Sequence, residues 1–115
     1  MTTLSTHVLN TAWGIPAENL RIDLKRIGPK TKHLGTFVTD ADGRVREVLL
    51  TAEEAILGIY EMTFYAGDYL KSNGLSLSKY PFLDVIPIRF GISDDCHYHV
   101  PLLLSPYGFS TYRGS

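Results

Sequence analysis

The sequence predicts an all-β protein, an antiparallel β-sandwich of seven or eight short strands with one helix. Three observations support this prediction. Apolar residues recur mostly at every second position, which is the period of a half-buried strand. Glycine, proline, asparagine and aspartate divide these stretches into short segments, as turns do. The stretch 67–74 has a possible start signal and a possible stop signal, and it is predicted to be the one real helix.

The first three predicted strands lie in the amino-terminal third of the chain. Residues 4–10 alternate weakly and precede a loop at 11–19 that contains glycine and proline. Residues 20–27 alternate cleanly, so their aliphatic side chains face one way and their charged ones the other. A turn then leads to a strand at 33–39. The segment 20–27 is thus predicted to be a half-buried strand, followed after the turn by a second strand.

Two turns follow in the middle of the chain. The Asp42-Gly43 pair predicts a tight turn, and Arg44 comes directly after it, near the end of a sheet, where functional groups are commonly displayed. Thr51 and Glu54 have the spacing of a capping box, so a short helical turn could begin there.

The remaining elements are a strand, the helix and three further strands. Residues 59–66 alternate, and the helix at 67–74 has Asp68 as a possible cap and Gly74 as a possible stop. The last strands are predicted at 82–92, 96–105 and 107–115. Pro87 and Pro101 indicate edge positions or irregular pairing, because proline cannot donate to a central ladder.

Composition restricts the class of protein. The 115 residues, 44% hydrophobic and 20% charged, predict one soluble globular domain over residues 1–115. A formal net charge of -1 argues against nucleic acid as a partner. The single Cys96 cannot form an internal disulfide, and no secretory signal, membrane span or SKL-type ending is visible. We therefore expect a cytoplasmic protein that binds no membrane.

His97 and His99 are the most informative of the four histidines, because side chains two apart on a strand share a face. Such a pair could bind zinc, with His7 or Asp95 as a third ligand, although nothing in the spacing demands it. An imidazole could instead act as a general base, with Arg44 or Arg113 stabilising the charge that develops on an attacked carbonyl. The residues alone do not choose between these interpretations.

Three stretches of the sequence carry a resemblance to a known family. They are HVLNTAWGIPA from His7, TDADGR ending at Arg44, and the closing HYHVPLLLSPYGFSTYRGS. Together they resemble the 5-hydroxyisourate hydrolases, the transthyretin-related proteins of urate breakdown, from about Leu4 to Ser115. Transthyretins share the fold and the LLSPY segment, but they lack the YRGS ending and the family's histidines. The resemblance favours the enzyme over the hormone carrier.

The resemblance implies a transthyretin-like sandwich of two four-stranded sheets, with a short helix after the fifth strand. It also implies that Thr51 begins a loop rather than a helix. Members are homotetramers, dimers of dimers, with active sites where the dimers meet. No metal and no cofactor are implied.

The resemblance also implies the site residues. His7, Arg44, His99 and Ser115 would be catalytic. Tyr112 and Arg113, together with His7 and Arg44, would bind the substrate. Many relatives have Asp where this chain has Asn10, so any group that the carboxylate orients would be held more weakly here.

The implied reaction is the hydrolysis of 5-hydroxyisourate to 2-oxo-4-hydroxy-4-carboxy-5-ureidoimidazoline, with no metal. His7 and His99 would position and deprotonate water, and Arg44 would bind the substrate's oxygens. Which imidazole is the base stays open, because coupled groups can share a titration. The alternatives are a transthyretin-like protein that binds a small ligand without turnover, a zinc hydrolase and a purely structural interaction domain.

Overall fold

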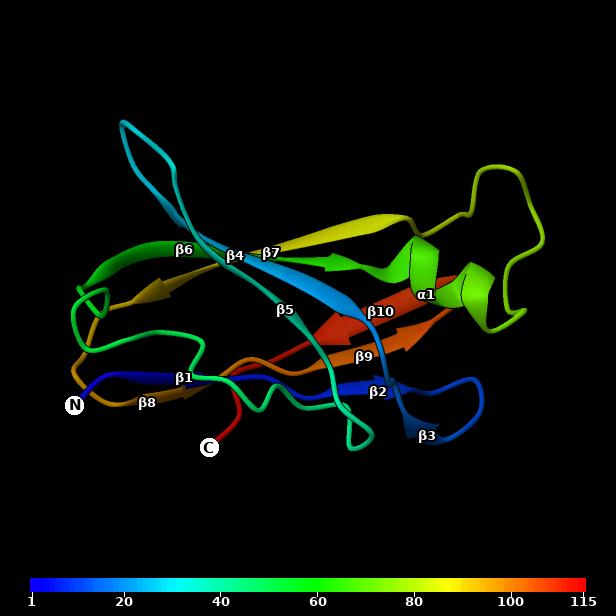
Figure 1. Ribbon diagram of the computed structural model, residues 1–115, viewed down its shortest axis with the longest axis horizontal. Helices are drawn as coiled ribbons and strands as arrows, with labels where there is room; N and C mark the ends of the chain where they lie inside the picture. The colour runs from blue at the N-terminus through cyan, green and yellow to red at the C-terminus, as the bar shows by residue number, and fades with distance from the viewer.

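The computed structural model describes residues 1–115, and its strands form two sheets that face each other, with one short helix beside them (Figure 1). The elements in chain order are β1 (Thr3–Ser5), β2 (Val8–Asn10), β3 (Ile15–Pro16), β4 (Arg21–Ile27), β5 (Lys32–Val38), β6 (Gly58–Tyr65), α1 (Ala66–Ser72), β7 (Val85–Ile92), β8 (His97–His99), β9 (Leu102–Ser105) and β10 (Gly108–Thr111). The predicted sandwich is confirmed.

One sheet has the strand order β5-β4-β6-β7, and the other has the order β10-β9-β2-β3. The β1–β8 pair extends the second sheet, since the amides of Val100 and Leu102 donate across the junction to the carbonyls of Ser5 and His7. Most neighbouring strands are antiparallel, as predicted, but β1 and β8 are parallel, and so are β2 and β9. Neither of these two pairs is joined by a hairpin, so nothing forces the chain to reverse.

Two of the predicted strands are divided in the structure. The segment 4–10 forms β1 and β2 with a break at Thr6 and His7, and the segment 96–105 forms β8 and β9 with a break at Val100 and Pro101. Pro101 has no amide hydrogen for the ladder, which explains the second break. The predicted loop 11–19 also contains the two-residue strand β3. Pro87 lies on the edge strand β7, which fits the edge position predicted for a residue that cannot donate to a central ladder.

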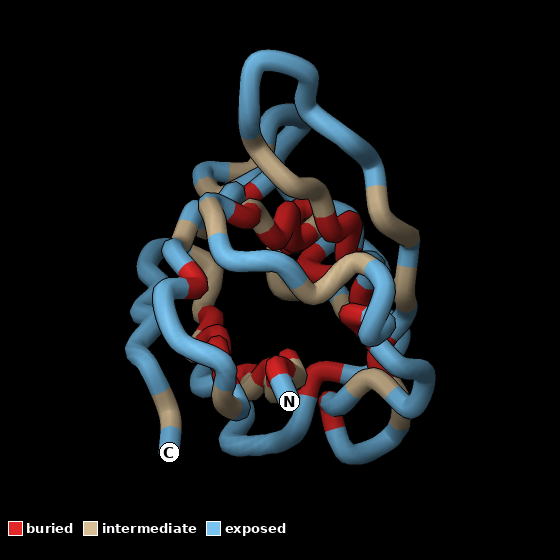
Figure 2. Tube along the Cα trace, turned by 90° about the vertical axis from the view of Figure 1, so that its left-hand side faces the viewer, coloured by how far each residue is buried: buried red, intermediate tan, exposed pale blue.

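The core lies between the sheets, where the buried segments gather in Figure 2. Leu20, Ile22 and Leu24 are each 0% exposed, which confirms the predicted inward face of β4. The opposite face of β4 is less open than predicted, because Asp23 is only 5% exposed. Its carboxylate accepts hydrogen bonds from Thr36, Tyr65 and Arg21 at 2.8–3.3 Å, so burial leaves no oxygen unpartnered.

The helix α1 begins one residue earlier than predicted, and its cap differs. Tyr65 occupies the N-cap without a side-chain cap, and Asp68 lies in the first turn instead, where its charge suits the helix dipole. Gly74 follows the end of α1 with φ at +70°, which confirms it as the stop. Thr51 and Glu54 form a single turn joined by their side chains and begin no helix. No helix has the length and apolar character needed to cross a membrane.

Candidate active site

His7 and Arg44 lie side by side although 37 positions separate them in the sequence. They form an antiparallel bridge between the break after β1 and the Asp42-Gly43 turn. The Nε2 atom of His7 is 2.8 Å from the carbonyl oxygen of Asp42. A carbonyl can only accept, so Nε2 carries the proton, and Nδ1 is the acceptor in neutral His7.

The turn that presents Arg44 has a fixed geometry. The carboxylate of Asp40 accepts hydrogen bonds from the amides of Arg44 and Asp42, and these two bonds lower the pKa of Asp40. Gly43 has φ at +76°, and a Cβ there would lie 2.3 Å from the carbonyl oxygen of Val8. Only glycine combines this backbone conformation with so close an approach. The turn therefore holds Arg44 against the first strand.

His99 reaches the same outer face of the sheet from β8. Its neighbours Tyr98 and Val100 are buried, 4% and 6% exposed, so alternation directs His99 outward. The Nδ1 atom of His99 is 2.7 Å from Ser5 Oγ on β1. This hydrogen bond occupies Nδ1 and leaves Nε2 as the nitrogen available for chemistry.

Gly114 packs against the other side of the His99 ring. Its amide donates to the carbonyl of His99 at 2.8 Å, and the two residues form an isolated bridge. A Cβ on Gly114 would lie 2.4 Å from Cδ2 of His99, closer than real side chains approach. The absence of a side chain at Gly114 therefore makes room for the imidazole. Ser115, the next residue, is exposed beside this contact.

The electrostatics of this face favour a neutral imidazole at His99. Burial lowers the pKa of His99 below its usual value, and the positive charge of Arg44 lowers it further. His7 and His97 act in the same direction. A neutral His99 can accept a proton at Nε2 near neutral pH, which is what a general base requires.

Arg44 is the fixed cation of this cluster. None of the four ion pairs of the chain involves its guanidinium. Its backbone amide and carbonyl are both bonded to Asp40, so the attachment point of the side chain is held while the guanidinium is exposed. Such a group can bind a carbonyl or anionic oxygen through two parallel hydrogen bonds.

Tyr112 and Arg113 lie away from this cluster within the chain. The guanidinium of Arg113 stacks 4.2 Å from the ring centre of Tyr98, whose side chain is directed opposite to that of His99. Its Nη2 atom is also 3.5 Å from Cys96 Sγ. Both residues line a mostly apolar groove of about 240 Å³ beside β7. Their predicted role in substrate binding stays a prediction.

Asn10, the position at which many relatives of the resembled family have aspartate, is directed into the protein. It is 1% exposed, its Nδ2 donates to Tyr69 Oη at 3.0 Å, and its Oδ1 accepts from the amide of Trp13. Asn10 thus joins β2 to the helix and touches none of His7, Arg44 or His99.

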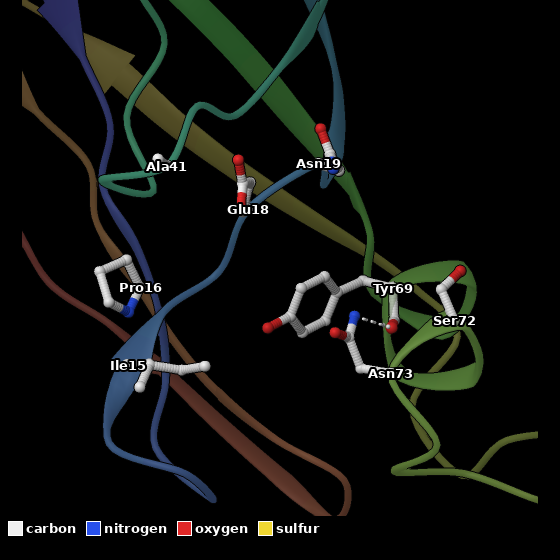
Figure 3. Close-up of a pocket in the computed structure, with 8 residues that line it drawn as sticks. All are labelled: Ile15, Pro16, Glu18, Asn19, Ala41, Tyr69, Ser72 and Asn73. Carbon is white, nitrogen blue, oxygen red and sulfur yellow. Dashed lines mark hydrogen bonds between the residues drawn. The ribbon is translucent and has the colours of Figure 1, made fainter.

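The largest cavity, about 530 Å³, lies elsewhere, between the β3 region and α1 (Figure 3). The residues that line it are Ile15, Pro16, Glu18, Asn19, Ala41, Tyr69, Ser72 and Asn73. Asn73 is engaged there in a hydrogen bond to the carbonyl of Tyr69, which ends the helix. None of the predicted site residues lines this cavity, and it lacks the pairing of imidazole with guanidinium. We therefore place the candidate site at His7, Arg44 and His99.

The alternative of a zinc hydrolase depends on His97 and His99 as two of the metal ligands. No group of three or more His, Cys, Asp or Glu side chains in the chain is arranged to hold a metal ion, and a catalytic zinc site needs three protein ligands. Asp95, one of the suggested third ligands, instead accepts a hydrogen bond from Thr2 at 2.8 Å and pairs with the terminal amine. His33 lies on β5, in the other sheet.

Sequence reasoning missed the residues that support His99. Ser5 and Thr3 precede His7 at intervals of two, so strand alternation is the signal that could have placed them on its face, although Thr3 lies outside the predicted strand 4–10. Nothing in the sequence indicates that they contact His97 and His99, because the parallel β1–β8 pairing joins segments more than 90 positions apart.

Comparison with known proteins gives consistent results. Residues 4–114 match the model of the HIUase/Transthyretin family. The chain is 54% identical over 114 residues to 5-hydroxyisourate hydrolase 2 of Rhizobium meliloti, covering 97% of this chain and 95% of that one. It is similar to the structure of Klebsiella pneumoniae 5-hydroxyisourate hydrolase, with 36% identity, a TM-score of 0.81, and coverage of 98% and 99% of the two chains.

A crystal structure of (S)-allantoin synthase matches with 50% identity and a TM-score of 0.92, over 99% of this chain. The match covers 44% of that longer protein.

Proposed function

The chain belongs to the HIUase/Transthyretin family, and we propose that it hydrolyses 5-hydroxyisourate in urate catabolism. The observation that carries this proposal is the meeting of His7, Arg44 and His99 on one outer face, with Nε2 of His99 free and Arg44 unpaired. A hydrolase that works without metal needs a base for water and a cation for the developing oxyanion, and this face offers both.

His99 is the general base in this proposal. Ser5 occupies its Nδ1 atom, and burial together with Arg44 keeps the ring neutral, so Nε2 can take a proton from the attacking water. His7 has its Nε2 proton committed to the carbonyl of Asp42. Its Nδ1 atom remains available as an acceptor, and in this proposal it orients the substrate or the attacking water.

Arg44 binds the carbonyl oxygen on which negative charge develops. Its guanidinium carries a permanent charge, and the Asp40 carboxylate fixes the backbone from which it extends. A donor placed before the reaction needs no reorganisation when the tetrahedral intermediate forms. Water then adds to the ring carbonyl, the carbon–nitrogen bond breaks and the ring opens to a carboxylate and a ureido group.

We propose that the remaining predicted residues act in the assembled protein, a homotetramer built as a dimer of dimers. The edge strands β7 and β10 lack a partner on one side, as β3 and β5 do, and Tyr107, Phe109 and Tyr112 are 79%, 45% and 57% exposed near β10. Exposed apolar edges favour association with another copy. Light scattering should give a mass four times that of the chain, and a monomer would contradict this proposal.

In that assembly Tyr112, Arg113 and Ser115 complete the substrate pocket at the interface between dimers. Arg113→Ala tests this pocket, because KM should rise if the guanidinium of a neighbouring copy binds the substrate.

Residues 1–115 act as one catalytic domain of a cytoplasmic protein, a location that the single unpaired cysteine favours. Cell fractionation tests the location.

The direct test of the proposed function is an ultraviolet assay of 5-hydroxyisourate decay, with the uncatalysed decay subtracted. We expect turnover that scales with enzyme concentration and is unchanged by a chelator. Tight binding of the substrate without accelerated decay would instead identify a ligand-binding protein. Loss of turnover on chelation, restored by zinc, would contradict the metal-free mechanism.

A further inference from the structure

The cavity of about 530 Å³ between β3 and α1 has the size of a small-molecule site. Its walls come from β3, from the loop that follows β3, from the turn at Ala41 and from the end of α1. Figure 3 shows the Tyr69 ring extending from α1 toward Ile15 and Pro16 on the opposite wall. None of the candidate active-site residues lines this cavity, so a ligand bound here lies outside the active site.

The hydroxyl of Tyr69 has a proton that no group of the chain accepts. Tyr69 is 5% exposed, and the hydrogen bond at its Oη comes from Nδ2 of Asn10, at 3.0 Å. The orientation of the Asn10 amide is fixed, because its Oδ1 accepts from the backbone amide of Trp13 at 3.1 Å. An amide nitrogen can only donate, so Tyr69 Oη is the acceptor in this pair. The hydroxyl proton is therefore left as an unused donor beside the cavity that Tyr69 lines.

A buried donor without an acceptor is unfavourable and calls for a partner from outside the chain. An oxygen atom of a ligand in the cavity would supply this partner. The Tyr69 hydroxyl thus requires that the ligand carry an acceptor.

Two other groups at the cavity are acceptors. The carboxylate of Glu18 takes part in none of the four ion pairs of the chain. The backbone amide and Nδ2 of Asn73 both donate to the carbonyl of Tyr69, which leaves Oδ1 of Asn73 without a donor. No lysine, arginine or histidine lines the cavity. Its single charge is therefore negative, opposite in sign to that of the active-site cluster.

We propose that this cavity is a second binding site and that it takes a small organic cation with a carbonyl oxygen, of the α-amino amide class. The ammonium group pairs with Glu18, and the carbonyl oxygen accepts from Tyr69. The remaining N–H groups can donate to Oδ1 of Asn73, and the aliphatic part of the ligand contacts Ile15 and Pro16.

The same groups discriminate against other ligands. An anion would be repelled by Glu18, and a wholly apolar molecule would leave Tyr69 and Asn73 unpaired. A cation is equally unsuited to the active site, where Arg44 repels it. The two sites therefore select ligands of opposite charge.

The first test measures binding of L-leucinamide to the whole protein by isothermal titration calorimetry. Near pH 7 an α-amino group is mostly protonated. We expect saturable binding with a Kd of roughly 1 mM or lower. Two related probes each lack one group: 3-methylbutylamine has no carbonyl, and N-acetyl-L-leucinamide has no charge. Both should bind roughly threefold to tenfold more weakly than L-leucinamide.

Two variants assign the contacts. Tyr69→Phe keeps the ring, and we expect it to weaken L-leucinamide roughly threefold to tenfold. It should leave 3-methylbutylamine unchanged, since that amine has no acceptor for the hydroxyl. Glu18→Gln should weaken both amines and leave N-acetyl-L-leucinamide unchanged. Glu47→Gln, at an exposed carboxylate away from the cavity, is the matched control and should bind every probe as the parent does.

Tyr69 lies in the core, so the melting temperature of Tyr69→Phe is measured first. Glu18→Gln changes an exposed side chain and tests the site even if Tyr69→Phe does not fold. In ¹H–¹⁵N spectra, L-leucinamide should shift the side-chain amide of Asn73 and the backbone amide of Ala41. The ring nitrogens of His99 should keep their shifts.

Absence of saturable L-leucinamide binding would overturn the proposal, because solvent then satisfies the Tyr69 hydroxyl. Equal affinities in the parent, Tyr69→Phe and Glu18→Gln would overturn it as well. So would ligand-induced shifts confined to His7 and His99. None of these measurements involves turnover, so this proposal and the proposed hydrolysis succeed or fail separately.

Discussion

The outer faces of the two sheets carry polar clusters of opposite character. On the β4–β6 face, Asp23 accepts hydrogen bonds from Thr36, Tyr65 and Arg21, and Arg21 also lies 4.3 Å from the centre of the Tyr65 ring. Every charge in this closed cluster has a partner. On the β1–β8 face, His7, Arg44 and His99 gather, and none of their side chains is in an ion pair.

The two clusters differ in their roles. The closed cluster stabilises the fold, and the open cluster can bind a ligand and react with it. In the closed cluster, hydrogen bonds to the carboxylate outweigh the effect of its burial and lower the pKa of Asp23. In the open cluster, burial and neighbouring cations lower the pKa of His99. One arrangement satisfies its charge internally, and the other leaves a base and a cation available to a ligand. Changes at the open cluster should therefore affect turnover, and changes at the closed one should affect stability.

The largest expected effect is that of His99→Ala. Removing the imidazole should lower kcat by roughly 10²–10⁴-fold, the contribution typical of a general base. The ultraviolet assay measures it, and the melting temperature should stay near the parent value because His99 is only partly buried. A variant with nearly normal turnover would remove His99 from the mechanism.

Arg44→Gln should have the next largest effect. Loss of one donor to a developing oxyanion costs roughly 10²–10³-fold in kcat. Arg44→Lys is the matched control, since it keeps the charge but lacks the planar pair of donors, and we expect it to recover only part of the activity. If glutamine serves as well as arginine, the guanidinium does not stabilise the transition state.

The same substitution tests the electrostatics of His99. Its folded pKa lies below the unfolded value, so the parent should stay active as the pH falls below about 6.5, where an ordinary histidine is half protonated. Stability contributed by the neutral ring is present above the unfolded pKa and is lost as the pH falls through the folded one. Arg44→Gln should move the acidic limb of the kcat/KM profile to higher pH. If the acidic limb of the kcat/KM profile stays at the same pH, Arg44 does not lower the pKa of His99.

Gly114→Ala should have the third largest effect on kcat. The added Cβ would lie 2.4 Å from Cδ2 of His99, so the ring must shift. Small displacements of a reacting group cost as much as roughly 10²-fold in rate. Gly108→Ala is a suitable control, because a Cβ there meets nothing closer than 3.7 Å. Equal kcat values for the two variants would mean that the ring tolerates the added methyl group.

The smallest effect on turnover should come from Asp23→Asn, which breaks the closed cluster. Asparagine cannot accept from all three donors, so the free energy of unfolding should fall by about 1–3 kcal/mol, while kcat stays at the parent value. Asp95→Asn, at an ion pair that is 72% exposed on both sides, should leave the free energy of unfolding close to the parent value. Urea titration measures both. A loss of activity in stable Asp23→Asn would contradict the division between the two clusters.

The sequence predicted the two-sheet architecture because period-two alternation and turn residues are local signals. It placed Leu20, Ile22 and Leu24 in the core and Arg44 after a turn for the same reason. It did not predict that Asp23 is buried, since its partners come from β5 and β6. The contacts of Ser5 and Gly114 with His99 could not be predicted either, because they depend on strand register and not on the spacing of residues in the sequence.

The parallel pairing of β1 with β8 also bears on how the protein acquires its site. Ser5 and His99 are 94 positions apart, so their contact closes a very long loop, and contacts of high sequence separation slow folding. The two strands lie together near the labelled ends of the chain in Figure 1. During synthesis β1 must wait, unpaired, until β8 has left the ribosome. Recovery of activity should therefore be among the last events of refolding, after the β5-β4-β6-β7 sheet has formed.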